Sequence, residues 1–353
     1  MVPKFGVCLL PELDEKILAD AFLAEELGYD YLWIGDHCQY DVFSMLTFFA
    51  QKTRRVRLGT SVTSPYTRHP TTIAAAIATV NEISSGRAVL GLGAAAGEVL
   101  RRQLFVPEFP LLHCKEAIEV IRPLLAGKTV TYEGETVRVN QYRLQMKAAN
   151  VPIYLAARGP RMLELAGESA DGVFINGLGA WPPALKNALQ HVATGARQAG
   201  RSLRELDVVC WTRIAISEDP DALRDLIRPV IGLKLSVVPD NILKKRFGIG
   251  PELAHLIKGR FEAIKRDRDP LRPVGVLGGS VEDLISDSFV EKYCLCGTPE
   301  QIVRRIRKLL DAGATQICLL NWPRRDRPED LSDVRIKTLR TFAEYVIPAF
   351  RDC

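Results

Sequence analysis

The chain has 353 residues, of which 47% are hydrophobic and 25% are charged. This balance is typical of a globular protein with a large core and argues against disorder. Lysine and arginine total 47 against 42 acidic residues, and this mild excess is spread along the chain, so no nucleic-acid partner is expected. No apolar run approaches the roughly 20 residues that span a bilayer, and no signal region precedes the first strand pattern. We therefore expect a cytoplasmic protein without a membrane partner.

The cysteine spacing gives little sign of a metal site or of disulfides. The chain has eight cysteines and no C-x-x-C pair, and several of the eight lie within apolar runs. Such residues are typical of reduced, buried side chains. Cys294 and Cys296 could form half of a metal site, but the sequence shows no second half. No metal ligands are expected.

Short apolar runs alternate along the chain with amphipathic stretches of helical periodicity. Glycine, proline or polar residues end most of the runs, which is typical of buried parallel strands. The predicted strands cover residues 5–10, 31–34, 56–58, 87–92, 152–155, 172–175, 207–216 and 316–320. The predicted helices include residues 13–27, 41–51, 71–83, 114–125, 181–199 and 299–312. Eight strands that alternate with helices predict an α/β protein, a (β/α)8 TIM barrel with right-handed crossovers.

Two segments depart from this alternation. Tyrosines and valines around Glu133-Gly134 predict a surface hairpin over residues 128–150. Residues 235–290 carry scattered glycine and proline and a charged run, and we interpret them as a partly helical insertion into a single barrel domain of residues 1–353. Because long insertions in barrels are usually functional, we expect this one to select the substrate or to form an oligomer contact.

Ligands of α/β barrels bind at the carboxyl ends of the strands, so residues near the ends of the predicted strands and just after them are candidates for a site. These residues are Cys8, Asp36, His37, Ser61, Val62, residues 91–98 and 156–159, Asn176 and Arg213. The glycines of residues 91–98 have the spacing G-x-G-x-x-x-G after the fourth strand, which is a weak match to a dinucleotide fingerprint. A metal-dependent hydrolase would need paired histidines after the first strand, where this chain has Cys8.

The predicted fifth strand leads into Arg158, Gly159 and Pro160. Proline is well placed at the first position of a helix because it lacks the N–H group that would be unpaired there. Free N–H groups at a helix start beside an arginine suit a phosphate group. This end of the barrel is therefore a candidate for an anionic ligand.

Several motifs together resemble a known family. They are Trp33–His37, Leu58–Pro70, Leu90–Gly93, Pro152–Pro160, Ala170–Gly172 and Gly297–Gln301. They are similar to the bacterial luciferase-like superfamily, and most similar to its coenzyme F420-dependent branch. Within that branch, Val62–Arg68 resembles the methylenetetrahydromethanopterin reductases. The resemblance covers nearly the whole chain apart from the insertion.

The resemblance implies an oxidoreductase that binds coenzyme F420, a deazaflavin, at the strand ends and transfers a hydride to or from a small-molecule substrate. It also implies a non-prolyl cis peptide at Ser61-Val62, in a bulge that backs the deazaflavin ring. The implied cofactor-binding residues are Asp36, Ser61, Val62, Thr63, Gly93, Ala157, Arg158, Gly159 and Asn176. The implied catalytic residues are His37 and Asp36, and a histidine with a near-neutral pKa suits proton transfer to or from the substrate. We expect a homodimer.

Two other classes of function stay open at this point. One is an FMN-dependent monooxygenase of the same superfamily, and the other is a cofactor-free barrel subunit that serves as a binding partner. Two departures bear on the substrate. Cys8 stands where the reductases have a glutamate on the first strand, and Ala96 stands where related sugar-phosphate dehydrogenases have a glutamate, with Glu98 shifted. We therefore expect a substrate other than methylenetetrahydromethanopterin.

Overall fold

The computed structural model describes residues 2–9, 15–36, 40–94, 108–147, 150–175, 180–236, 238–266, 284–321 and 330–351. The chain divides into two compact units, which are described separately. The first unit comprises Met1–Thr212, Ile306–Leu320 and Phe350–Cys353, and the second comprises Arg213–Arg305 and Asn321–Ala349.

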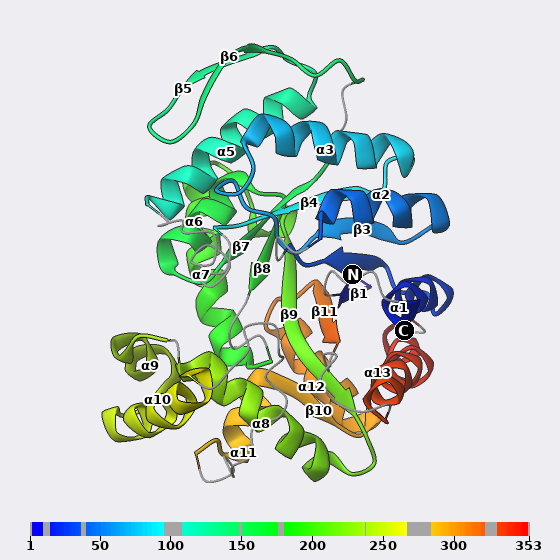
Figure 1. Ribbon diagram of the computed structural model, residues 1–353, viewed down its shortest axis with the longest axis vertical. Coiled ribbons are helices and arrows are strands. Elements are labelled where there is room, and N and C mark those ends of the chain that lie inside the picture. Colours follow the sequence, from blue (N-terminus) through cyan, green and yellow to red (C-terminus); the bar gives the residue numbers. More distant parts are fainter. Residues whose placement is uncertain are drawn as a thin grey trace. The chain divides into compact units, whose positions relative to one another are not determined.

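The first unit is built on a closed ring of strands (Figure 1). In ring order the strands are β1 (Lys4–Leu9), β2 (Tyr31–Ile34), β3 (Arg57–Thr60), β4 (Ala88–Leu92), β7 (Ile153–Ala157), β8 (Gly172–Ile175), β9 (Asp207–Ile216) and β11 (Gln316–Asn321). Every pairing from β11 through β1 to β9 is parallel, and β9 lies beside β11, which closes the ring. All eight predicted strands are present, and the predicted (β/α)8 barrel is confirmed.

Most helices between these strands begin at a proline or after a capping residue. They are α1 (Glu15–Glu26), α2 (Val42–Lys52), α3 (Pro70–Ile83), α5 (Pro110–Leu125), α6 (Pro160–Ser169), α7 (Pro182–Gln198), the short 3₁₀ turn η1 (Leu203–Glu205) and α12 (Pro299–Asp311). The Asp41 side chain caps α2, because its carboxylate accepts the N–H of Ser44 at 2.7 Å. The prediction placed the start of α5 at Cys114, which is wrong, since Phe109 in a left-handed conformation and Pro110 begin the helix.

The predicted hairpin is formed by β5 (Val130–Glu133) and β6 (Arg138–Tyr142), which pair antiparallel. Its turn encloses the buried carboxylate of Glu116 from α5, which accepts the N–H groups of residues 135, 136 and 137 at 2.8–2.9 Å and the Thr136 hydroxyl at 2.6 Å. A Cβ atom at Gly134 would lie 2.5 Å from that carboxylate. The turn therefore needs glycine there, and a side chain of the helix fixes the hairpin to the barrel.

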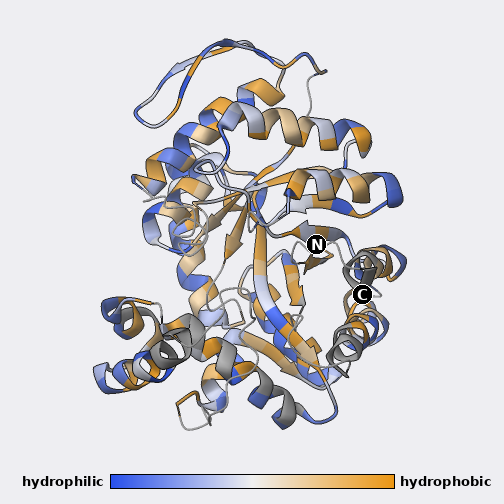
Figure 2. Ribbon diagram, viewed as in Figure 1, coloured by the Kyte–Doolittle hydropathy of each residue, from blue (hydrophilic) through white to orange (hydrophobic). Residues whose placement is uncertain are grey.

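The interior of the ring is filled by side chains. The buried cluster consists of Cys8, Tyr31, Trp33, Val89, Tyr154, Phe174, Val209, Cys318 and Leu320. Trp33 stacks on Tyr31 at 5.2 Å between ring centroids and meets Phe174 edge-on at 4.9 Å. A Cβ atom at Gly59 would lie 2.2 Å from the Trp33 ring, so the glycine makes room for the indole. Figure 2 shows β7 and β8 mainly in hydrophobic colours, whereas α3 and α5 carry both kinds of residue. The barrel is a packed core, as in other TIM barrels.

At the amino-terminal end of the strands, the carboxylate of Asp207 collects several donors. Lys4 Nζ donates to its two oxygens at 2.7 and 2.9 Å, the Thr315 hydroxyl donates at 3.2 Å, and the Tyr154 hydroxyl donates as well. Burial by itself would lower the pKa of Lys4, but the hydrogen bond and charge of Asp207, together with Tyr31, outweigh burial and raise that pKa. These contacts join side chains of β1, β7 and β9 with the residue that precedes β11.

The second unit contains the end of β9, paired in parallel with β10 (Cys294–Gly297), and a set of helices. The helices are α8 (Pro220–Ser236), α9 (Asp240–Phe247), α10 (Pro251–Arg266), α11 (Asp287–Tyr293), α13 (Asp330–Thr341), η2 (Phe342–Val346) and α14 (Pro348–Arg351), the last of which ends in the first unit. The predicted insertion, 235–290, falls in this unit and is partly helical as expected, although residues 267–283 lie outside the described residues.

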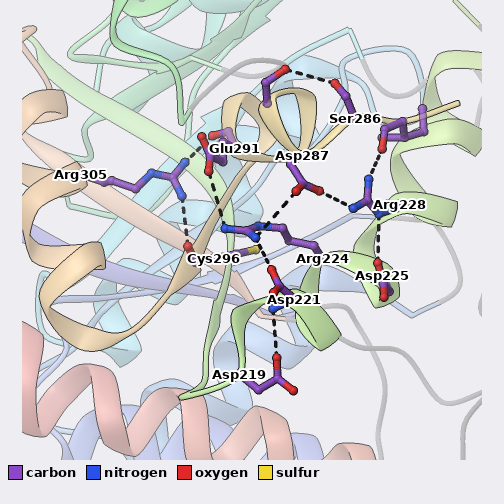
Figure 3. A network of polar contacts seen from close by, with 12 residues as sticks. Asp219, Asp221, Arg224, Asp225, Arg228, Ser286, Asp287, Glu291, Cys296 and Arg305 are labelled. Carbon is purple, nitrogen blue, oxygen red and sulfur yellow. Dashed lines mark hydrogen bonds and ion pairs between the residues drawn. The ribbon is translucent and has the colours of Figure 1, made fainter. Parts of the chain in front are cut away.

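Arginines hold the elements of the second unit together (Figure 3). Arg228 on α8 pairs with Asp225 and with Asp287 at the start of α11. Its neighbour Arg224 lies 3.7 Å from Glu291 on α11. From α12, Arg305 donates to backbone carbonyl oxygens of β10, including that of Cys294 at 2.6 Å. These contacts tie α8, α11, α12 and β10 together through groups that satisfy one another.

Candidate cofactor site

The residues that directly follow the barrel strands lie at one end of the first unit. Asp36 follows β2, Ser61 and Val62 follow β3, Gly93 follows β4, and Ala157 ends β7. Because the carboxyl ends of parallel strands meet at the same edge, these residues surround a single mouth. This arrangement agrees with the prediction that the strand-end residues converge. Their contacts with one another are as follows.

The peptide bond between Ser61 and Val62 is cis, as the sequence resemblance implied. Its neighbours are hydrogen-bonded to strands on both sides. Ser61 N–H donates to the carbonyl oxygen of Ile34 at 2.7 Å, and Thr63 N–H donates to that of Gly91 at 3.0 Å. Gly93 N–H in turn donates to the carbonyl oxygen of Thr63 at 3.0 Å. The bulge is therefore held between the end of β2 and the end of β4.

The bulge packs against a place where β4 has no side chain. A Cβ atom at Gly93 would lie 2.8 Å from Cγ2 of Val62 and 3.2 Å from Cβ of Ala156. Val62 and Ala156 are half-buried and pack on the core of the barrel. We call Val62, Gly93 and Ala156 the floor of the mouth. A floor made of one isopropyl group, one methyl group and a bare backbone suits a flat, largely apolar ring.

The carboxylate of Asp36 contacts Thr63 and Arg68 within the protein. Its side chain is only 2% exposed, and one of its oxygens accepts the Thr63 hydroxyl at 2.8 Å. The same oxygen lies 3.5 Å from Nε of Arg68. A carboxylate so buried needs such partners to stay ionised. These contacts suit a residue that holds the loop in place better than one that transfers a proton.

A thiol lies next to Ser61. Cys8, at the end of β1, is 1% exposed, and its Sγ donates to the Ser61 hydroxyl at 3.7 Å. A hydrogen bond from Cys318 on the adjacent strand lowers the pKa of Cys8 and outweighs burial, whereas burial raises the pKa of Cys318 itself. The place of the family's first-strand glutamate is therefore occupied by a buried thiol that contacts the cis peptide.

The start of α6 follows the end of β7. Gly159 is the N-cap residue and provides no side-chain cap, and Pro160 takes the first helical position as predicted. Ala157 is buried, whereas Arg158 and Gly159 are exposed. An uncapped helix start beside an exposed arginine is able to bind an anionic group. This geometry is compatible with cofactor binding by Ala157, Arg158 and Gly159, which stays a prediction.

Several sequence predictions concern residues that cannot be placed. His37, Asn176 and residues 95–98 lie outside the described residues, and their roles stay predictions. Arg68 was part of the resembling motif, but its contacts with acidic residues were not predicted. Within the described ranges, no three His, Cys, Asp or Glu side chains group so that they could hold a metal ion. Six cysteines in these ranges are buried and form no disulfide. None of the described helices is long and apolar enough to cross a membrane.

Comparison with known proteins places this arrangement in a family. The family model described as luciferase-like monooxygenase matches residues 11–316. The chain belongs to this family. The resemblance drawn from the strand-end motifs is therefore confirmed, and with it the expected luciferase-like barrel.

Two of the three relatives described next carry coenzyme F420 in their names. A 5,10-methylenetetrahydromethanopterin reductase of Methanolobus tindarius is 39% identical over 89% of this chain and 92% of its own length. An F420-dependent glucose-6-phosphate dehydrogenase of Nakamurella multipartita is 30% identical over 95% of this chain and 92% of its own length. The solved coenzyme F420 dependent tetrahydromethanopterin reductase of Methanopyrus kandleri is 31% identical, with a TM-score of 0.83, over 99% of this chain and 100% of that one. The F420-dependent branch of the family is thus represented by sequence and by structure.

Proposed function

We propose that this chain is a coenzyme F420-dependent oxidoreductase that transfers a hydride between the deazaflavin and a small organic substrate. The names of its relatives support the cofactor. The observation that carries the proposal is the floor of the mouth. There Val62 of the cis peptide packs against the backbone of Gly93, in the space that a side chain would otherwise fill. A close-packed surface made of Val62, Ala156 and the bare backbone of Gly93 suits a planar, largely apolar ring. The FMN-dependent and cofactor-free alternatives are not favoured by these relatives.

When bound, F420 supplies the carrier of the hydride. The chain itself supplies the binding groups and the exclusion of water. Val62 would back one face of the ring, while Ser61 and Thr63 would border it. The start of α6, with Ala157, Arg158 and Gly159, and Asn176 would hold the phosphate-bearing tail. With Val62 on one face, the opposite face would be the one open to the substrate.

His37 is proposed to carry the proton that accompanies hydride transfer. It directly follows Asp36, whose carboxylate is fixed by Thr63 and Arg68. An imidazole has a pKa near neutrality and can give or take a proton at physiological pH. Asp36 serves in this proposal as the group that fixes the chain before His37. The two predicted catalytic residues therefore have different tasks.

The substrate is proposed to differ from methylenetetrahydromethanopterin. Cys8 stands in place of the first-strand carboxylate of that reductase family, and its thiol is buried and contacts Ser61. A thiol is a weak hydrogen-bond donor and acceptor, so it cannot take the place of a carboxylate toward a polar ring. We propose a small electrophilic substrate that needs no carboxylate at this position.

At the level of the whole protein, we propose a cytoplasmic homodimer in which residues 1–353 act as one domain. Residues 235–290 are proposed to select the substrate. Removal of this segment is expected to change substrate affinity while the affinity for F420 stays the same. Loss of assembly with unchanged substrate affinity would instead indicate an oligomer contact. The size of the protein in solution and both affinities decide between these roles.

The experiment is a substrate screen with reduced F420. Purified full-length protein is mixed with reduced cofactor and with small aldehydes, imines, enones and methylene pterins, and the return of oxidised deazaflavin absorbance is followed. Reduced FMN at the same concentration is the control. Turnover of at least one substrate with F420 and none with FMN is expected. Turnover with FMN and oxygen alone would support the monooxygenase instead.

A further inference from the structure

Arg68 connects two acidic residues at the mouth of the barrel. Its Nε lies 3.5 Å from Oδ2 of Asp36, and its Nη1 lies 3.0 Å from Oδ2 of Asp41. The guanidinium plane also covers the ring of Phe43, 5.4 Å from its centroid. The arginine is mostly buried, with 22% of its side chain exposed. Such a planar cation, held by two acids and an aromatic ring, has little freedom of its own.

The Asp36 end of this arrangement continues to the cis peptide. The oxygen of Asp36 that faces Arg68 also accepts the hydroxyl of Thr63 at 2.8 Å. Thr63 directly follows Val62 and is fully buried. Its backbone is hydrogen-bonded to Gly91 of β4 and to Gly93, which directly follows β4, at 3.0 Å each. Arg68, Asp36, Thr63 and Gly93 therefore form a continuous chain of contacts that ends at the floor of the mouth.

The Asp41 end has a different connection. Asp41 caps α2 by accepting the N–H of Ser44, and its side chain is 45% exposed. Burial raises the pKa of Asp41, but the bonds from Ser44 and the charge of Arg68 outweigh it and lower that pKa. Arg68 thus bridges Asp36 and Asp41 through two different nitrogens, and of these two acids it is Asp36 that continues to Thr63.

We infer that Arg68 is a positioning residue for the cofactor, which holds the Ser61-Val62 peptide in place through Asp36 and Thr63. The inference rests on the proposed function, since it assigns the floor to F420. Without Arg68, the buried carboxylate of Asp36 loses its cationic partner and turns toward water. The hydroxyl of Thr63 then loses its acceptor, and the peptide that backs the ring is no longer held in one place.

The test measures F420 affinity by fluorescence titration of the full-length protein and of four variants. Arg68→Ala is expected to weaken F420 binding about tenfold, because the buried carboxylate of Asp36 loses the positive charge beside it. Thr63→Val should weaken binding by a similar factor, and the double variant should be no weaker than the worse single variant, because both act through one contact chain. Arg68→Lys should recover part of the affinity.

Arg122→Ala is the matched control. Arg122 pairs with Asp171 at 3.0 Å in the same unit, at the start of β8, which is the other end of the barrel. Its loss should lower the melting temperature and leave F420 affinity within twofold of wild type. Circular dichroism of each variant shows that it is folded; if Arg68→Ala does not fold, Arg68→Lys and Arg68→Gln take its place.

The outcomes separate the inference from the proposed function. If wild type does not bind F420, the proposed function fails. If wild type binds and the Arg68 variants bind equally well, the proposed function stands and the inference is overturned. Additive losses from Arg68→Ala and Thr63→Val would also overturn it, because independent effects do not pass through Asp36.

Discussion

At its amino-terminal end the barrel surrounds the carboxylate of Asp207 with Lys4, Tyr154 and Thr315, whereas at its carboxyl end the carboxylate of Asp36 is held by Thr63 and Arg68. The donors at this amino-terminal end, the base of the barrel, lie in β1 and β7 or directly before β11. The donors at the mouth come from the loop that follows the cis peptide. An acid that joins strands stabilises the ring, and an acid that holds a loop fixes a binding surface. This division agrees with the general placement of active sites in TIM barrels.

The largest expected effect lies at the mouth. His37→Ala should lower kcat by about 10²–10⁴-fold, the usual contribution of a general acid or base, while F420 still binds. The measurement is turnover at saturating reduced F420 together with a cofactor titration. His191→Ala is the control, since His191 on α7 contacts Glu164 at 3.2 Å, away from the strand ends. Nearly full turnover by His37→Ala would show that another group moves the proton.

The next effect lies at the base. Asp207→Ala should lower the free energy of unfolding by about 2–4 kcal/mol, because the Tyr154 hydroxyl and the Lys4 ammonium lose their shared acceptor. The affinity for F420 should not change. Urea unfolding and a cofactor titration measure the two quantities on the same sample. Weaker F420 binding at unchanged stability would contradict the division between base and mouth.

The role of the floor of the mouth can be tested by substituting glycine with alanine. Gly93→Ala should weaken F420 binding about tenfold, because the new methyl group would collide with Val62 and shift the floor. Gly259→Ala on α10 is the control, since no atom lies within 4 Å of its added Cβ and no role in cofactor binding is assigned to it. Equal F420 affinities of the two variants would mean that the ring does not lie on this floor.

A smaller effect on turnover is expected from substitution of Cys8. Wild type should reduce methylenetetrahydromethanopterin and methylenetetrahydrofolate slowly with reduced F420, and Cys8→Glu should raise the rate severalfold by restoring the carboxylate. Cys8→Gln has nearly the same size without the charge and is the control for crowding in the buried site. Fast turnover of either substrate by wild type would defeat this prediction, and equal gains from Glu and Gln would exclude the charge as its cause.

A third carboxylate, in the hairpin, is expected to show the smallest effect and to depend on pH. Burial opposes ionisation of Glu116, but bonds from Thr136 and from the N–H groups of the turn outweigh it and lower its pKa. Its contribution is therefore present above the unfolded pKa of about 4.3 and is lost as pH falls through the lower folded pKa. Glu116→Gln should cost about 1 kcal/mol at neutral pH and nearly nothing in strong acid. Urea unfolding at both pH values checks this, and a pH-independent difference would contradict it.

Much of the barrel could be predicted from the sequence because each strand is a short apolar run that ends at glycine, proline or a polar residue. Pro160 and Asp41 are residue types that favour helix starts, and both stand at the start of a helix. The start of α5 was missed although Pro110 is a fair signal, since Phe109 in a left-handed conformation has no sequence signature. The strand β10 has only four residues and lies beside an irregular segment, so periodicity could not reveal it.

The site was predictable only in part. The cis peptide followed from the family resemblance, because nothing in a serine-valine pair favours the cis form. The contact between Asp36 and Arg68, and that between Cys8 and Ser61, join residues far apart in the sequence. Such pairs depend on how the strand ends are arranged around the ring, which local patterns do not encode. The structure was needed to show that Asp36 holds a loop.

Equilibrium titration of the full-length protein with F420 and, separately, with FMN tests the central claim most directly. The account predicts saturable F420 binding in the micromolar range and FMN binding at least about tenfold weaker, since the floor at Val62 and Gly93 and the start of α6 are assigned to the deazaflavin. Tight binding of FMN without binding of F420 would contradict the account. Binding of neither cofactor would contradict it as well and would indicate a barrel that serves only as a partner.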